Sequence, residues 1–509
     1  MTDSPRYLLA LDQGTTSSRA LVYDLHGEEI ASASVPLNVS FPQDGWVEQR
    51  PEEIWQTQFE ALSEATKNIR AEHLWAIGIS NQRETTIAWD RATGHAVAPA
   101  VVWQCRRSEE ICRELRRDGL QPLIHGLTGL VIDAYFSATK IAWLLRHIPS
   151  LPERVAKNEI VFGTVDSWLL YQLGRLDGES VFLTDPTNAS RTMLCDLNGT
   201  WNETLLGKFG LSREALCAIH PSAGYFTQTR IGSAVVPVTG VLGDQQASLL
   251  GHGCAQPSSV KCTFGTGAFL LMNTGTAQKQ STSGMLTTIA SGFECDGELK
   301  LTYALEGSVF VAGSLLQWLR DKIGVVALAS ESEELAESVP DSGGVIVVPA
   351  FVGLGAPYWN ADVRGAIFGL TRDTSKAHLV RAALEGVAHQ VADLLDASEF
   401  SQVQKLKIDG GMSANRAFCQ ILADLTRREV EVAPSAELTA KGAALIAAVG
   451  ANQRAEKPLE QFRTIESACT AWSVGGGRSY RPSLSDEAAK SARRLWTRAI
   501  RGLLAAAQS

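Results

Sequence analysis

Two turns rich in glycine and threonine contain the first residues of this sequence that could do chemistry. The first, Asp12–Arg19 (DQGTTSSR), lies between the apolar runs Tyr7–Leu11 and Ala20–Tyr23. Its glycine lets the backbone approach a ligand, and its hydroxyl and N–H groups can donate to phosphate oxygens, while Arg19 adds a positive charge. Asp12 would repel a phosphate unless a cation lay between them, which suggests Mg²⁺. The turn therefore predicts a phosphate clamp, with a long solvated hairpin loop as the alternative.

The second turn repeats this design in the other half of the chain. Gly265, Thr266 and Gly267 lie between two apolar runs of the segment SSVKCTFGTGAFLLMNTG, residues 258–275. Two such hairpins facing each other could hold a polyphosphate from both sides. Gly410 and Gly411, between a strand pattern and a helix pattern, offer a third close approach of backbone to a nucleotide. The P-loop motif GxxxxGK[ST] and a GxGxxG after a strand are both absent from the sequence, which disfavours the P-loop and Rossmann folds.

A pair of opposite charges ends an apolar strand pattern in AIGISNQRETTIAW. Arg83 and Glu84 are adjacent, and adjacent residues of a regular strand point to opposite faces. For both side chains to reach one ligand, the chain must bend at this point. The alternative is an ordinary Arg-Glu pair on the surface.

Further polar groups follow at Asp244 and Gln245, in a GDQQ sequence between a β-branched run and an apolar helix pattern. Asp244 could be a plain helix N-cap, or a carboxylate at the edge of a cleft. Trp103 and Tyr135 are by default buried aromatic residues. Together with Arg83 and Glu84, these side chains offer donors, acceptors and aromatic walls that suit a small polyol.

Strand and helix patterns alternate along the chain, which predicts an α/β fold. A meander is expected over residues 7–11, 18–23 and 29–35, and a helix from Pro51 with Ile54, Trp55, Phe59 and Leu62 on one face. Further strands are expected near 75–80, 85–89 and 100–103, and helices near 109–118, 137–147, 378–396 and from Asp486. We expect two domains, residues 1–250 and 251–509, divided within Leu249–Pro257.

The composition fits a large globular protein and disfavours several classes of partner. The 509 residues carry 45% hydrophobic and 20% charged side chains and a net charge of −9, with no run of basic residues. Nucleic acids and anionic membranes are therefore disfavoured as partners. Nine scattered cysteines, no apolar N-terminal signal and no long uncharged apolar run predict a cytoplasmic protein with reduced thiols.

The residues in this order resemble the FGGY carbohydrate kinases. The resemblance runs from about Tyr7 to about Val449. It is carried by ALDQGTTSSR, GWVEQ, SNQRETT, VWQCRR, YFSATKIAWLL, GTVDSWL, TDPTNASRTM, GDQQ, FGTGAF, ALEGSVF, GLGAPYW and RGAIFGLTRDTSKAHLVRAALEG. It implies two actin-like (ribonuclease H-like) ATPase domains flanking a catalytic cleft. It also implies transfer of a phosphoryl group from ATP, with Mg²⁺, to glycerol, giving sn-glycerol 3-phosphate.

The resemblance also implies a role for individual residues. Asp244 would be the general base, Asp12 would help to place Mg²⁺, and both carboxylates would be metal ligands. The implied glycerol contacts are Arg83, Glu84, Trp103, Tyr135, Asp244, Gln245 and Phe269. The implied nucleotide contacts are Thr15, Thr16, Ser17, Arg19, Thr266, Gly313, Gln317, Gly411 and Asn415.

Some segments depart from the family pattern. Ala134 replaces a usual proline and Ala268 a frequent cysteine. Residues 227–240 lack the glycine-rich loop with which some members bind fructose bisphosphate, and the divergent segment 471–484 makes inhibition by a carrier protein doubtful. Two other functions stay open: a kinase for another small polyol or sugar, and an actin- or chaperone-like ATPase module. We also expect a homo-oligomer, either a dimer or a tetramer.

Overall fold

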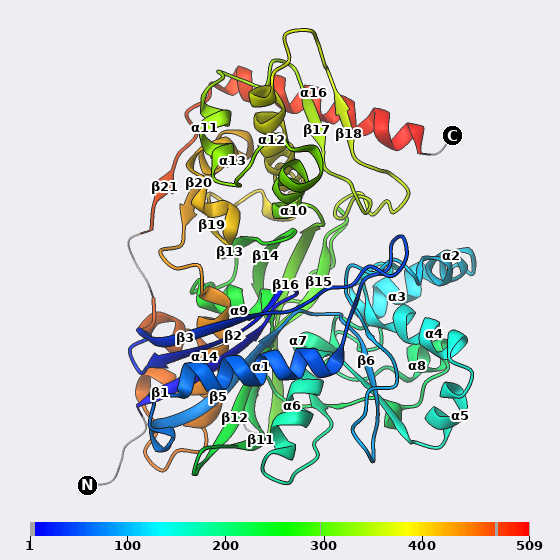
Figure 1. Cartoon of the computed structure of the whole chain (residues 1–509), viewed down its shortest axis with the longest axis vertical. Helices are drawn as coiled ribbons and strands as arrows, with labels where there is room; N and C mark the ends of the chain where they lie inside the picture. The colour runs from blue at the N-terminus through cyan, green and yellow to red at the C-terminus, as the bar shows by residue number, and fades with distance from the viewer. Residues whose placement is uncertain (1–5, 296, 474–476, 508–509) are drawn as a thin grey trace.

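One mixed β-sheet of thirteen strands runs through the protein (Figure 1). The computed structural model describes residues 6–295, 297–473 and 477–507. The strand order is β21-β20-β19-β13-β14-β16-β15-β11-β12-β5-β1-β2-β3. In chain order these strands are β1 (Tyr7–Gln13), β2 (Ser17–Asp24), β3 (Glu29–Pro36), β5 (Leu74–Asn81), β11 (Ala223–Ile231), β12 (Ala234–Gly243), β13 (Val260–Phe264), β14 (Ala268–Gly275), β15 (Leu286–Cys295), β16 (Glu298–Val309), β19 (Lys405–Asp409), β20 (Glu429–Val432) and β21 (Ser479–Tyr480).

The two halves of the sheet have the same core topology. In the first half β1 pairs antiparallel with β2 and parallel with β5, which pairs parallel with β12. In the second half β13 pairs antiparallel with β14 and parallel with β19, which pairs parallel with β20. The two halves meet where β11 runs parallel to β15, through the described pair Ala223–Phe293. The repeated hairpins predicted from the sequence are therefore equivalent parts of two related units.

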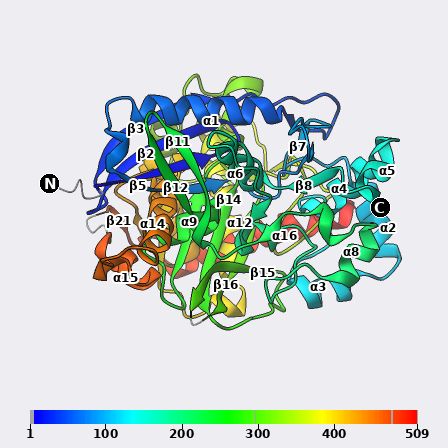
Figure 2. The same ribbon diagram turned by 90° about the horizontal axis from the view of Figure 1, so that it is seen from below.

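Strand β1, in the first half of the sheet, is buried on both faces, because its alternate residues enter different cores. Leu9 and Leu11 pack in one cluster with α1 (Pro51–Thr66) and α6 (Val165–Arg175). Leu8 and Ala10 pack in another with α14 (Leu438–Asn452) and α15 (Ile465–Ala471). Figure 2 shows α1 on one side of these strands and α14 and α15 on the other. The helices α14 and α15, from the C-terminal half of the chain, thus cover one face of the first half of the sheet.

Small residues allow α14 to lie very close to the sheet. A Cβ atom added at Gly78 on β5 would stand 1.9 Å from the carbonyl oxygen of Ala443 on α14. Gly240 on β12 approaches Ala447 in the same way, at 2.4 Å from its backbone nitrogen. Glycine is needed at these positions because any side chain would push the helix away.

Helix α1 holds the first hairpin through polar side chains. Thr57 shares a hydrogen bond of 2.8 Å with Ser18, and the Gln58 amide donates to the backbone oxygen of Arg19 at 2.9 Å. These two side chains take the inward positions between Ile54 and Ala61. The prediction that Phe59 belongs to the buried face is wrong. Because Thr57 and Gln58 occupy the inward face of α1, Phe59 points outward and is 40% exposed.

Helices also surround the second half, and α16 crosses its far end (Figure 1). These helices are α9 (Asp244–Gly251), α10 (Gly313–Trp318), α11 (Glu331–Glu337), α12 (Lys376–Leu395), α13 (Arg416–Thr426) and α16 (Asp486–Ala506). A separate group lies to one side of the first half: α2 (Glu109–Arg117), α3 (Gln121–Thr128), α4 (Ser137–His147), α5 (Leu151–Ala156) and α8 (Glu203–Phe209). Short strands β6 (Ile87–Asp90) and β8 (Ile160–Gly163) form a small sheet beside it.

The α/β prediction and the expected long elements are confirmed, with ends displaced by a few residues. The expected helix 378–396 spans Lys376–Leu395, and the expected strand 100–103 is only Ala100–Val101. Within the described residues, no helix has both the length and the apolar character needed to cross a membrane. Residues 474–476 of the divergent segment lie outside the described part.

Candidate active site

Two adjoining cavities contain nearly all of the predicted site residues. A smaller cavity of about 230 Å³ and a larger one of about 530 Å³ share Thr16, Gly265 and Thr266 in their walls. The smaller cavity is lined by Asp12, Thr15, Thr16, Arg19, Arg83, Glu84, Trp103, Tyr135, Asp244, Gln245, Thr266 and Phe269 from the predicted set. The larger is lined by Thr16, Thr266, Gly313, Gln317, Gly411 and Asn415 from that set. Ser17 lines neither cavity, because it closes the first turn.

Both hairpin turns lie at the wall between the cavities. The N–H of Gly14 donates to the backbone oxygen of Ser17 at 2.9 Å, which fixes the first turn. In the second turn, the oxygens of Gly265 and Thr266 accept from the N–H groups of Gly313 and Ala312, at 3.0 and 2.9 Å. The start of α10 is thereby tied to the β13–β14 turn. Backbone from the β1–β2 turn, the β13–β14 turn and the start of α10 therefore lies close to the wall that the two cavities share.

The bend predicted after β5 is present at Glu84, whose φ is +60°. This left-handed backbone turns both Arg83 and Glu84 toward the smaller cavity, where their side chains are 1% and 2% exposed. The Nε atom of Arg83 lies 3.2 Å from Asp244 and makes no hydrogen bond. The alternative of a surface Arg-Glu pair is therefore wrong.

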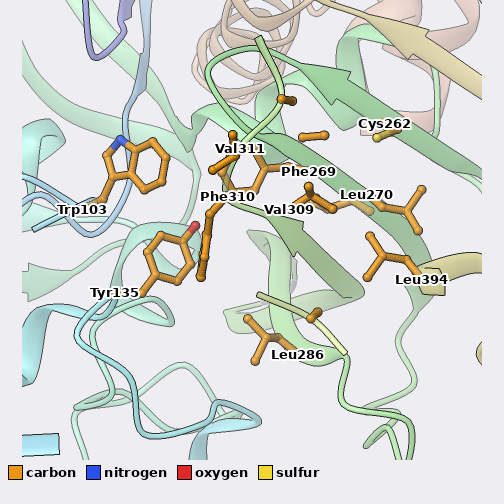
Figure 3. Close-up of a cluster of buried hydrophobic side chains, with 14 of the residues drawn as sticks. Trp103, Tyr135, Cys262, Phe269, Leu270, Leu286, Val309, Phe310, Val311 and Leu394 are labelled. Carbon is orange, nitrogen blue, oxygen red and sulfur yellow. The ribbon is translucent and has the colours of Figure 1, made fainter. Parts of the chain in front are cut away.

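Trp103, Tyr135 and Phe269 form another wall of the smaller cavity, and Figure 3 shows these aromatic side chains near one another. The ring of Trp103 meets Tyr135 and Phe269 edge to face, with centroids 5.9 and 5.8 Å apart. Phe310 packs against Tyr135 at 5.7 Å. The indole Nε1 of Trp103 donates to the Thr15 hydroxyl at 2.9 Å, so this wall also anchors the first hairpin turn.

Asp244 is the first residue of α9, and Gly243 flanks the helix. The alternative that Asp244 is a plain N-cap is wrong, since its Oδ1 accepts from the N–H of Gln245 at 2.7 Å and not from a later residue of the turn. Burial raises the pKa of Asp244 to about 6, although Arg83 acts in the opposite direction. A carboxyl group with such a pKa, 31% exposed into a cavity, can exchange a proton near neutral pH.

Comparison with known proteins places the chain in a family. Residues 7–251 match the N-terminal domain, and residues 260–451 the C-terminal domain, of the FGGY family of carbohydrate kinases. The chain belongs to that family. It is 44% identical over 505 residues to a glycerol kinase of Carboxydothermus hydrogenoformans, covering 97% of both chains. It is 46% identical over 514 residues to a glycerol kinase of Methylibium petroleiphilum, covering 98% of this chain and 99% of the other.

Solved structures confirm the fold expected for an FGGY kinase. The crystal structure of Plasmodium falciparum glycerol kinase with ADP has a TM-score of 0.86 and 33% identity, covering 98% of this chain and 99% of the other. A xylulose kinase from Rhodospirillum rubrum shares the fold at 23% identity, with a TM-score of 0.79. The expected α/β fold of two actin-like domains is therefore confirmed, and the domain boundaries stay a prediction.

The sequence interpretation of this FGGY kinase missed a buried charge network behind the smaller cavity. Glu306 on β16 accepts from Arg83 Nη1 and Nη2 at 2.6 and 3.1 Å, and from Arg191 Nη2 at 2.8 Å. The Nε atom of Arg191 also donates to Glu84 at 2.6 Å. Carboxylates and guanidinium groups therefore alternate in the order Asp244, Arg83, Glu306, Arg191, Glu84.

The network fixes the charges of its members. Burial alone would raise the pKa of Glu306, but Arg191 and Arg83 lower it to about 2. Burial alone would lower the pKa of Arg83, but Glu306 and Glu84 hold it well above its ordinary value. Glu306 and Arg191 belong to the quoted segments ALEGSVF and TDPTNASRTM. A charged residue among the apolar and small residues of ALEGSVF was the available signal for Glu306.

A buried lysine, also missed, holds Gln245. Lys261 on β13 donates to the side-chain oxygen of Gln245 at 2.5 Å and to the Thr263 hydroxyl at 2.8 Å. Burial lowers the pKa of Lys261. Because Thr263 also lines the smaller cavity, this lysine connects two groups of the cavity wall.

The first hairpin carries a second charge arrangement. Arg19 lies 2.5 Å from Asp12 and 2.6 Å from Glu437, which precedes α14. Asp12 and Asp244 line the same cavity, and no group of three or more histidine, cysteine or acidic residues suited to a metal occurs in the described residues. Mg²⁺ binds through one or two carboxylates plus substrate phosphates and water, so the two acids fit a shared metal.

Proposed function

We propose that this kinase transfers the γ-phosphoryl group of ATP to glycerol, giving sn-glycerol 3-phosphate. The observation that carries the proposal is the smaller cavity, in which Arg83, Glu84 and Asp244 face an aromatic wall, next to a larger cavity lined by the second hairpin and α10. A volume of about 230 Å³ suits a small polyol. Curated relatives that match nearly the whole chain are named glycerol kinases, which supports the same substrate.

Each side chain of the smaller cavity has a proposed role. Arg83 Nε, buried without a hydrogen bond, donates to a hydroxyl of the substrate, while Glu84 and Gln245 take part in further hydrogen bonds. Trp103 and Phe269 cover the carbon chain, and Tyr135 contributes its hydroxyl. A site with this many polar groups rejects molecules that lack the matching hydroxyls, because its own groups would stay unpaired.

Asp244 takes the proton of the attacking hydroxyl in this proposal. A general base works best when its pKa lies near the working pH, and burial brings Asp244 to about 6. Backbone N–H groups and hydroxyls at Thr15, Thr16 and Thr266 bind the phosphates between the cavities, with Arg19 beside them. The rest of the nucleotide lies along Gly313, Gln317, Gly411 and Asn415 in the larger cavity. Ser17 contributes through the geometry of its turn.

Magnesium belongs to the proposal through Asp12 and Asp244. When bound, the ion would neutralise negative charge on the phosphate oxygens. Asp12 is already held by Arg19, so the protein offers one oriented carboxylate there. A cytoplasmic location and a homo-oligomeric state, dimer or tetramer, are proposed with the function, and size-exclusion chromatography with light scattering measures the latter.

A coupled assay of ADP release across a panel of acceptors tests the substrate. With Mg-ATP, glycerol should give the highest kcat/KM among glycerol, xylulose, ribulose, fuculose and gluconate. A pentulose with the highest value would favour the alternative of a kinase for another sugar. ATP hydrolysis that no acceptor stimulates would favour an actin- or chaperone-like module.

A further inference from the structure

A groove outside both cavities lies between α16 and the end of α13. It encloses about 910 Å³, and seven of its thirteen lining side chains are arginine or lysine. Lys490, Arg494, Arg498 and Arg501 follow one another at intervals of four, four and three residues, so they share one face of α16. Figure 1 shows α16 across the end of the molecule, far from α1.

The acidic residues of the groove do not balance these charges. The two that line it are already engaged, Asp396 with Arg493 at 2.7 Å and Asp486 with Arg427 at 2.5 Å. Of the four cations in this row, Arg494 pairs with Glu487 at 2.9 Å, whereas Lys490, Arg498 and Arg501 form no ion pair with any other described residue. Positive charges on neighbouring turns of one helix repel each other, so a bound anion would stabilise this face. The whole chain, in contrast, carries a net charge of −9.

Arg428 lines the opposite wall of the groove, and its guanidinium group is only partly hydrogen-bonded. Its Nε atom is buried and makes no hydrogen bond. Its Nη1 contacts only the backbone oxygens of Thr426 and Arg427, each at 3.4 Å, which is long for a hydrogen bond. A guanidinium group in this state lacks the acceptor that its fork geometry can bind.

We propose that the groove between α13 and α16 is a binding site for an anion that carries at least two neighbouring phosphate groups. Arginine binds phosphate in a bidentate manner, and the row from Lys490 to Arg501 extends over about 16 Å at 1.5 Å per helical residue. That length exceeds what one carboxylate or one phosphate can contact. The phosphates can belong to a free small molecule or to a lipid headgroup.

Isothermal titration with inorganic tripolyphosphate, without magnesium, tests the site. Because tripolyphosphate can also enter the ATP site, the comparison is between the wild type and the double variant Arg494→Glu/Arg498→Glu. We expect the wild type to bind at two sites, and the variant to bind at the groove at least tenfold more weakly while the other site is unchanged. Affinity at the groove should also fall as salt is raised.

Two controls keep the result interpretable. The matched variant Arg113→Glu/Arg117→Glu, on an exposed face of α2, makes the same change in net charge and should keep both sites. Both groove arginines are exposed and lie outside the cavities, so kcat and the melting temperature should stay at wild-type values. If the double variant does not fold, the single variant Arg498→Gln should give a smaller loss of the same site.

A vesicle assay identifies the source of the phosphates. Co-sedimentation with vesicles that contain cardiolipin, whose headgroup carries two phosphate groups, would assign the site to lipid headgroups if the groove variant loses it. Tripolyphosphate binding without co-sedimentation would assign it to a free ligand. Identical tripolyphosphate isotherms for wild type and groove variant, together with no difference in sedimentation, would overturn the proposal.

Discussion

The substitution Asp244→Asn separates the catalytic role of this residue from a structural one. The amide keeps the size of the side chain and one oxygen that can accept from the N–H of Gln245, but it cannot take a proton. Loss of a positioned general base typically lowers the rate by about 10²–10⁴, so kcat should fall by that order. Nucleotide affinity should change little, because the nucleotide contacts proposed above lie mainly in the larger cavity.

The pKa of Asp244 also predicts the effect on stability. Burial raises it from 3.8 to about 6, and each unit corresponds to about 1.4 kcal/mol. Because the folded-state pKa lies above the unfolded one, the folded protein loses stability as pH rises from about 4 to about 6. Above pH 6 the ionised carboxylate costs about 1–3 kcal/mol. Arg83 keeps its two bonds to Glu306, so the neutral variant should melt at the same temperature as the wild type or higher.

Three measurements on the same variant test this reasoning: kcat, the dissociation constant of ADP and the melting temperature. The wild type should lose kcat/KM tenfold per pH unit below about pH 6, as the base becomes protonated. The argument is refuted by a folded variant that keeps more than about a tenth of the wild-type kcat. A lower melting temperature with normal turnover would show instead that the residue is structural.

The other predictions concern the charge network, the sheet and regulation. Glu306→Gln leaves the buried cations Arg83 and Arg191 without their carboxylate. This change should lower the free energy of unfolding by about 3–5 kcal/mol, measured by urea titration, and raise KM for glycerol, measured by steady-state kinetics. Unchanged values of both would contradict the role given to the network. Gly78→Ala should lower the melting temperature through a loss of about 1–3 kcal/mol or more, because the new Cβ meets the backbone of α14; a neutral result by differential scanning fluorimetry would contradict the close packing. Fructose 1,6-bisphosphate at millimolar concentration should inhibit little, because Arg230 on the β11–β12 hairpin already pairs with an aspartate at 2.8 Å; saturable inhibition would contradict this.

Local sequence signals predicted the hairpins and the bend, because their physical causes are local. Turn residues such as glycine and threonine between apolar runs mark β1–β2 and β13–β14 without any knowledge of the rest of the fold. Two adjacent charges that must reach one ligand require a bend, and Glu84 has the positive φ that provides it. The resemblance to FGGY kinases then supplied the roles of Gly313, Gln317 and Asn415, which have no local signature of their own.

Long-range pairing explains what the sequence did not reveal. Arg83 and Glu306 are 223 residues apart, so no periodicity connects them. The α16 groove combines residues 427–428 with residues 490–501, and a search for basic runs finds neither part. The expected burial of Phe59 failed for a related reason. A polar pair on α1 is needed inside to hold the hairpin, which hydrophobic periodicity cannot anticipate.

The position of α14 has a consequence for synthesis on the ribosome. The strands of the first half are complete at Gly243, but one face of them stays uncovered until α14, which ends at Asn452, has been made. At about 5–20 residues per second, this interval of roughly 200 residues lasts about 10–40 s. Throughout that time Leu8, Ala10 and their neighbours form an apolar surface without its helix. A protein stopped near residue 250 should therefore be insoluble, even though Asp244 and the first hairpin are both present. The full-length chain would need some other contact to cover this face until α14 is made.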